Sequence, residues 1–206
     1  SDYDRPRDLH PADGIKVYVS KYGVWQADAL GKEEGKDWFG SLVKGRTEEV
    51  LPHAWGGYHD AGDFDRHYNH LWATYQVLEL MEMHPAYFAK QKLSLPPTEV
   101  SNKIPDTLDE ALWNLDCFRR LQRADGGIYG GIESSSHPRY GETSYLESLV
   151  VLAYAPDAAA SYTFAAVAAK AARVLKPYDA KLSQTYAQAA TKAFDWAEKN
   201  RETSIN

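Results

Sequence analysis

Residues 157–199 read "DAAASYTFAAVAAKAARVLKPYDAKLSQTYAQAATKAFDWAEK" and decide the fold class. The stretch holds two runs of apolar residues spaced three or four positions apart, as on one face of a helix. Each run begins at an aspartate, Asp157 or Asp179, a residue type that caps helix N-termini. Only "KPYD" joins the runs, so the stretch predicts two antiparallel helices over 157–175 and 179–199. The first is rich in alanine, and small side chains allow close helix packing.

Two further helices are predicted upstream. Residues 67–83 place apolar side chains on one line, and Pro85 stops the run. Residues 105–122 carry leucine and phenylalanine at spacings of three and four, and the glycines of "ADGG" end the run. Trp72 and Trp113 fall on these periodic segments and are predicted to pack in the core.

The rest of the chain is less regular. Residues 1–55 show no sustained period, although "KVYVSKYGVW", residues 16–25, could form a short strand. The apolar segment "YLESLVVLAYAP", residues 145–156, fits a strand or a helix equally well. Long connections over 84–104 and 123–156 separate the helices, and loops of that length are often functional. The predicted class is all-α, with long loops that form an open cleft.

The composition excludes some classes of protein. The 206 residues are 44% hydrophobic, enough for one domain with a core. The net charge is −6 with both signs interspersed, which argues against a nucleic-acid partner. No run of about 18 apolar residues occurs, so no membrane span is predicted. A single cysteine, Cys117, cannot form an internal disulfide and is predicted to be a buried thiol.

Residues 56–70, "GGYHDAGDFDRHYNH", carry three Asp and three His within fifteen positions. One interpretation is a polar turn in which Asp65 caps the next helix. A second is a metal site, but the spacing fits neither an EF-hand loop nor an HExxH helix, and no metal ligand is assigned. In every interpretation the glycines permit backbone conformations with positive φ.

The third interpretation is a glycosidase carboxylate pair. Inverting hydrolysis needs one carboxylate to activate water and one carboxylic acid to protonate the leaving oxygen, about 6.5–9.5 Å apart. Asp60 and Asp63 are three positions apart and could share the base side, with one deprotonating the water and the other holding it. The acid would then come from elsewhere.

Three segments together resemble glycoside hydrolase family 9, the cellulase family. "GGYHDAGDFDRHYNH" resembles that family's signature "GGWYDAGD". Residues 104–132, "IPDTLDEALWNLDCFRRLQRADGGIYGGI", are similar to the segment ending in "mQ…dGGVyhkv", and residues 155–179 resemble the Ala-rich helix that follows. Order and rough spacing agree, and the resemblance covers about 50–200.

The resemblance implies a portion of an (α/α)6 barrel and a set of site residues. Asp63 would be the general base, and Asp60 would bind the same water. Tyr58 and His59 would lie near the cleaved bond, although the family often has Tyr where this chain has His59. Trp55 would be a sugar platform, or equally a packing residue.

The chain departs from the family after "DGGIY". Gly130 and Gly131 stand where the family commonly has a His-Lys pair. Tyr129, Glu133 and His137 lie in the same loop and could substitute in binding sugar. Of the three, Tyr129 is the predicted substrate-binding residue. A solvated loop is the simpler interpretation for all three.

The resemblance also implies that 1–206 is the N-terminal half of a catalytic domain, with 1–55 as wrapping loops and 56–206 as helical barrel. Four good helices fall short of a double ring of twelve, and the later segment that supplies the general acid is absent. Half a barrel would expose a wide apolar face, so we expect a partner, the complementary C-terminal half.

The expected function is that of a secreted endo-β-1,4-glucanase-like hydrolase, with β-glucan as substrate. Full activity would need a second chain or the missing half. The alternatives are a family relative acting on another β-glycan, such as xyloglucan or a glucosamine polymer, and a non-catalytic carbohydrate-binding module or fragment. No cofactor is required; a structural calcium ion is implied as possible, without assignable ligands. Extracellular action follows from a polymeric substrate that cannot enter cells.

Overall fold

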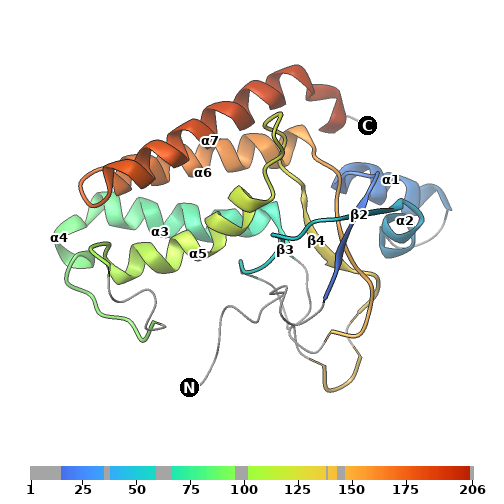
Figure 1. The fold of residues 1–206 in the computed structure, drawn as a ribbon, viewed down its shortest axis with the longest axis horizontal. Coiled ribbons are helices and arrows are strands. Elements are labelled where there is room, and N and C mark those ends of the chain that lie inside the picture. The colour runs from blue at the N-terminus through green and yellow to red at the C-terminus, as the bar shows by residue number, and fades with distance from the viewer. Residues whose placement is uncertain are drawn as a thin grey trace.

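The computed structural model describes residues 15–34, 38–58, 66–95, 102–137, 139–142 and 147–204. Long helices form one block of the molecule, and a small sheet with two shorter helices lies beside it (Figure 1). The long helices are α3 (Leu71–Met83), α5 (Asp106–Arg120), α6 (Ala158–Leu175) and α7 (Ala180–Lys199), and the short α4 (Pro85–Phe88) follows α3. All four predicted helices are therefore confirmed.

The α6–α7 hairpin forms as its caps predict. The Asp157 carboxylate accepts a hydrogen bond from the Ala160 N–H at 2.8 Å, and the Asp179 carboxylate accepts one from the Leu182 N–H at 2.9 Å. These bonds satisfy backbone donors that a helix start otherwise leaves unpaired. The Ser183 hydroxyl donates to the Ala172 carbonyl at 2.7 Å and so joins the two helices.

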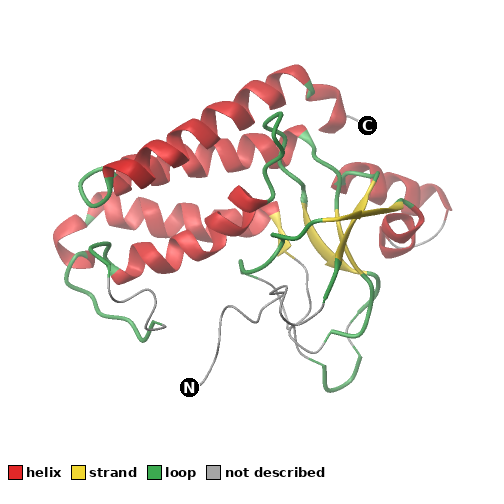
Figure 2. Cartoon of the chain, viewed as in Figure 1, coloured by secondary structure: helices red, strands yellow, loops and turns green. Residues whose placement is uncertain are grey.

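The prediction of an all-α class is wrong in one respect, because the chain also forms a five-stranded sheet (Figure 2). Its order is β2-β1-β5-β4-β3; β1 and β5 are parallel, and the other neighbours are antiparallel. The strands are β1 (Val17–Ser20), β2 (Arg46–Val50), β3 (Arg66–His67), β4 (Gly131–Ser134) and β5 (Val151–Ala153). Strand β1 confirms the short strand predicted in 16–25.

The segment predicted as wrapping loops is also more regular than expected. Besides β1 and β2, it forms α1 (Val24–Glu34) and α2 (Trp38–Lys44). Neither helix was predicted from the sequence. Both helices pack on one face of the sheet, where Ala27 and Leu42 meet Leu152. The neighbours Val151 and Ala153 point to the opposite face and join the core of the long helices, as alternation along a strand requires.

Helix α3 corrects one core prediction. Trp72 is 54% exposed, whereas Leu71 and Leu78 are fully buried. Trp72 follows Leu71 by one position, which turns it about 100° around the helix, away from the core. Trp113 of α5 is half-buried, and Cys117 is a buried thiol as predicted. No helix within the described ranges is both long and apolar enough to cross a bilayer.

Candidate functional site

The first residues of the predicted catalytic stretch lie against α5. Gly56 has φ +77° and Gly57 has φ +85°, conformations that a glycine at these positions permits. A Cβ atom on Gly57 would lie 3.1 Å from both the Cβ and the Sγ of Cys117, and one on Gly56 would lie 3.1 Å from the Arg120 guanidinium. The two glycines therefore satisfy two requirements, a left-handed backbone and close contact with a helix.

Trp55 is held by the last turn of α5. The Arg120 guanidinium lies over its ring, 3.8 Å from the centroid, and donates a hydrogen bond of 2.7 Å to its carbonyl oxygen. Arg120 is itself paired with Asp116 one turn earlier. The Trp113 ring lies 6.0 Å away, tilted by 58°. One face of the Trp55 ring is thus covered by a cation, and its predicted role as a sugar platform stays a prediction.

Tyr58 is the last described residue before the two predicted catalytic aspartates. Its backbone N–H donates to the Asn114 side-chain oxygen at 3.0 Å, and its hydroxyl donates to the Glu110 carbonyl at 2.7 Å. Both partners lie on α5, one turn apart. Tyr58 is only partly buried, and its predicted contact with substrate is untested.

His59, Asp60 and Asp63 lie outside the described residues. The chain is described again from β3 and the short 3-10 helix η3 (Tyr68–His70). Here the His70 Nδ1 lies 3.1 Å from the Tyr58 carbonyl oxygen. Tyr58 and His70, which lie on either side of both aspartates in the sequence, therefore contact each other.

A buried acid contacts His67 of β3. Glu133 of β4 is 3% exposed, and its Oε2 lies 2.7 Å from the Nε2 of His67. The His67 ring also packs edge-on against Tyr154, with centroids 5.3 Å apart. The interpretation of Glu133 as part of a solvated loop is wrong, because β4 pairs on both sides, with β3 and β5. His137 is exposed, as that interpretation predicted.

Tyr129 is buried as well, at 7% exposed, which also corrects the solvated-loop interpretation. Its hydroxyl donates to Glu49 at 3.4 Å. Burial raises the pKa of the phenol above its ordinary value, and the nearby Glu49 charge raises it further. The predicted role of Tyr129 in binding sugar remains a prediction.

The glycine at position 130 fits its surroundings closely. A Cβ at position 130 would lie 2.9 Å from both Asp157 Oδ2 and Val24 Cγ2. Asp157 itself is 1% exposed, and burial raises the pKa of its carboxyl to about 6. The hydrogen bond from the Ala160 N–H lowers this pKa and so partly offsets the effect of burial. Gly131 has φ +139°, which glycine adopts readily. A larger side chain at 130 would have to displace these neighbours.

The described residues hold no group of three or more His, Cys, Asp or Glu side chains arranged to bind a metal ion. The implied calcium ion stays a prediction.

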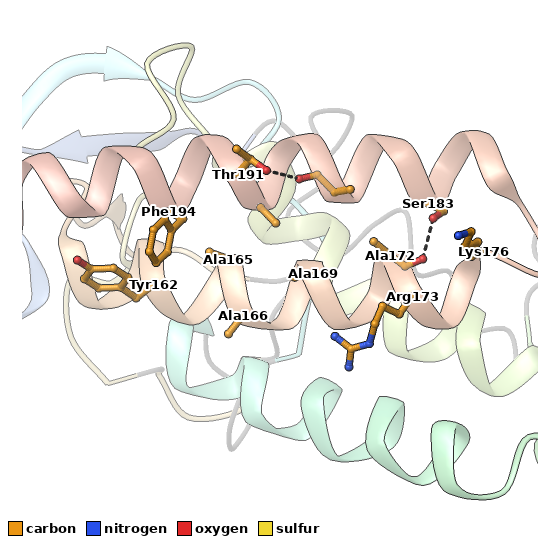
Figure 3. Close-up of a pocket in the computed structure, with 12 residues that line it drawn as sticks. Tyr162, Ala165, Ala166, Ala169, Ala172, Arg173, Lys176, Ser183, Thr191 and Phe194 are labelled. Carbon is orange, nitrogen blue, oxygen red and sulfur yellow. Dashed lines mark hydrogen bonds between the residues drawn. The ribbon is translucent and has the colours of Figure 1, made fainter.

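A second feature lies away from this segment, on the outer side of the α6–α7 hairpin. It is an apolar groove of about 780 Å³, floored by alanines, with Tyr162 and Phe194 at one end (Figure 3). Arg173 and Lys176 mark the other end. The residues that line the groove carry no catalytic constellation, so it fits a packing surface better than an active site.

Comparison with known proteins identifies the family. Residues 19–206 match the family described as Glycosyl hydrolase family 9. The chain belongs to this family. It is 29% identical over 163 residues to the xyloglucan-specific endo-beta-1,4-glucanase BoGH9A of Bacteroides ovatus, covering 73% of this chain and 26% of that protein. It is 32% identical over 149 residues to Endoglucanase C of Cellulomonas fimi, covering 66% of this chain and 13% of that protein.

Solved family 9 structures share the fold. A metagenome-derived glycoside hydrolase family 9 endoglucanase superposes with a TM-score of 0.67 at 30% identity, covering 75% of this chain and 28% of that one. A Bacteroides ovatus family 9 structure gives a TM-score of 0.72 at 24% identity, covering 94% of this chain and 32% of that one. This chain is therefore a mostly helical portion of a family 9 catalytic domain, with a small sheet, and it spans about a third or less of these relatives.

The contacts made by α5 were missed at the sequence level. No role was predicted from the sequence for Asn114, Asp116 or Arg120. One signal was available: Asn114 lies three positions after Ala111 and four before Phe118, in line with buried residues. A polar side chain on an apolar line has to find hydrogen-bond partners inside the protein.

Proposed function

We propose that this family 9 chain supplies the general-base side of an inverting hydrolase that cleaves β-1,4-glucosidic bonds in cellulose or related β-glucans. Asp63 would remove a proton from the attacking water, and Asp60 would hold that water by a hydrogen bond. The observation that carries the proposal is a set of contacts between the residues on either side of both aspartates in the sequence. Tyr58 before them and His70 after them are joined to each other and to buried Asn114.

The reaction needs an acid on the other side of the sugar, which must keep its proton near neutral pH. We assign none of the described carboxylates to this role: Glu133 is paired with His67, and Asp157 caps a helix. The acid would come from the part of the domain that the relatives have and this chain does not span. We propose that this complementary part is the partner of the chain.

The surface of the helical block supports such a partner. The apolar groove on α6 and α7 is open, and α3 exposes Trp72, Leu80 and Met83. Exposed apolar patches of this kind usually mark an interaction surface. Their covering by the rest of the barrel would complete the domain. A polymeric substrate further implies that the enzyme works outside the cell, and its chemistry requires no cofactor; a stabilising calcium ion remains a proposal.

The alternative substrate is another β-glycan. One relative is described as xyloglucan-specific, and Gly130 and Gly131 remove two side chains from a segment that the family uses near the cleavage point. Comparing rates on xyloglucan, a glucosamine polymer and unbranched β-1,4-glucan would separate these possibilities.

The decisive test is Asp63→Asn in the protein that carries the complete domain. Loss of a general base is expected to lower kcat by about 10²–10⁴-fold, while affinity for cello-oligosaccharides stays within about twofold. Asp195→Asn removes the same charge from an exposed site on α7 and should leave both unchanged. A D63N variant with an unaltered kcat would instead favour a binding module without catalysis.

A further inference from the structure

Asn114 uses both ends of its side-chain amide on the two borders of the predicted catalytic segment. It is fully buried on α5. Its Oδ1 accepts the Tyr58 N–H at 3.0 Å, and its Nδ2 donates to the His70 carbonyl at 3.1 Å and to the Thr74 hydroxyl at 3.0 Å. A buried amide with three such bonds leaves little freedom to Tyr58 or His70.

His70 closes the same contact from the other side. Its Nδ1 lies 3.1 Å from the Tyr58 carbonyl oxygen, which can only accept a hydrogen bond. The proton of the neutral imidazole must therefore be on Nδ1, and Nε2 carries the lone pair. The tautomer of His70 thus reports whether Tyr58 and His70 are in contact.

We infer that Asn114 and His70 are positioning residues for the base side of the reaction. They join Tyr58 to His70, two residues that lie on either side of Asp60 and Asp63 in the sequence. This inference rests on the proposed function. Its physical basis is preorganisation: a group that must sit within about 0.5 Å of its productive position needs supports that are themselves locked.

The side-chain type at 114 is strongly restricted. Leucine has the size of asparagine but neither donor nor acceptor. Aspartate keeps the acceptor for the Tyr58 N–H but loses the donors to His70 and Thr74. Gly57 also limits the space, since a Cβ there would lie 3.4 Å from Asn114 Oδ1. Asn114→Leu should thus remove the hydrogen bonds to both Tyr58 and His70. Asn114→Asp should remove only the bond to His70.

The first experiment is 15N NMR of the histidine side chains in this 206-residue chain, at a pH about one unit above the ordinary histidine pKa of about 6.5. The His70 signal is assigned by its disappearance in His70→Gln. We expect protonated Nδ1 and unprotonated Nε2 in the wild type, and loss of this pattern in N114L. A wild type with protonated Nε2, or a folded N114L with an unchanged pattern, would overturn the inference.

The matched control is Gln122→Leu. Gln122 follows α5 and also donates two side-chain bonds, to Gly126 and Ala189 carbonyls at 3.2 and 2.9 Å. It touches neither border residue, so Q122L should keep the His70 pattern. This control separates a general loss of packing from loss of the contact itself.

The second experiment measures kinetics in the complete domain. Misplacement of a catalytic group by about 1 Å costs up to about 10²-fold, so N114L and N114D are expected to lower kcat about 10- to 100-fold with KM within about twofold. His70→Gln keeps a donor and should retain more kcat than His70→Leu. Unchanged kcat in N114L, beside an inactive D63N, would overturn the positioning role and leave the proposed function standing. An active D63N beside the expected His70 pattern would remove the function and leave the Tyr58–His70 contact standing.

Discussion

His67 of strand β3 and the buried Glu133 of strand β4 form a pair, with 2.7 Å between Nε2 and Oε2. The Glu133 side chain is 4% exposed and that of His67 is 23% exposed. An acid in such a place is stable only with a partner, because burial of an unpaired charge is costly.

Glu133→Ala is therefore expected to lower the free energy of unfolding by about 1–3 kcal/mol, since it leaves the His67 ring N–H without its acceptor. Glu133→Gln keeps an acceptor oxygen and should lose clearly less. Urea denaturation of both variants measures the difference. Glu48→Ala, at an exposed position on β2, is the control and should change stability little. Equal losses in E133A and E133Q would show that the hydrogen bond contributes nothing.

Gly57 tests the close contact between the catalytic segment and α5. Gly57→Ala combines a backbone at φ +85° with a Cβ only 3.1 Å from Cys117. The expected loss is about 2–4 kcal/mol, the sum of left-handed strain and overpacking. Gly141→Ala is a matched control, with φ +84° and no atom within 4 Å of the new Cβ. It should lose only about 1–2 kcal/mol, and equal losses in thermal unfolding would contradict the contact.

Gly130 tests why this chain lacks the side chain that its family commonly has there. Gly130→Ala places a methyl group 2.9 Å from Val24 Cγ2 and Asp157 Oδ2, and we expect it to cost about 1–3 kcal/mol. Val24→Ala removes one of these neighbours, so the double variant should be more stable than the sum of the single losses predicts. Strict additivity in the double-mutant cycle would mean that Val24 does not set the limit.

The sequence predicts the helical part of the fold well and the sheet poorly, for physical reasons. Helices α6 and α7 are local: Asp157 and Asp179 cap them, and their periodicity spans four or more turns. The shortest strands, β3 and β5, have two and three residues. Such strands form only through partners far along the chain, as when Val17 pairs with Val151, and no local pattern carries that information.

The candidate site divides in the same way. The turn at Gly56 and Gly57 could be anticipated from the sequence, because only glycine adopts positive φ freely. The contacts that hold the segment come from α5, whose Asn114 lies 56 residues from Tyr58. That partnership follows from helix packing and could not be predicted from spacing. The same holds for Glu133, whose burial depends on β4 lying between two other strands.

Asp157 provides a pH-dependent test of the helix α6 cap. Burial raises the pKa of its carboxyl to about 6 from an ordinary 3.8, so the folded state holds this proton more tightly than the unfolded state. Its contribution to stability is full below about pH 4 and is lost as pH rises through about 6. The size is roughly 3 kcal/mol.

Asp157→Asn keeps a good helix cap but cannot titrate. The difference in unfolding free energy between wild type and D157N should therefore change in favour of D157N as pH rises from about 4 to 7. Urea denaturation at several pH values measures this, and Asp195→Asn on the exposed face of α7 should show no such trend. A difference between wild type and D157N that is constant with pH would mean that Asp157 titrates alike in the folded and unfolded chain.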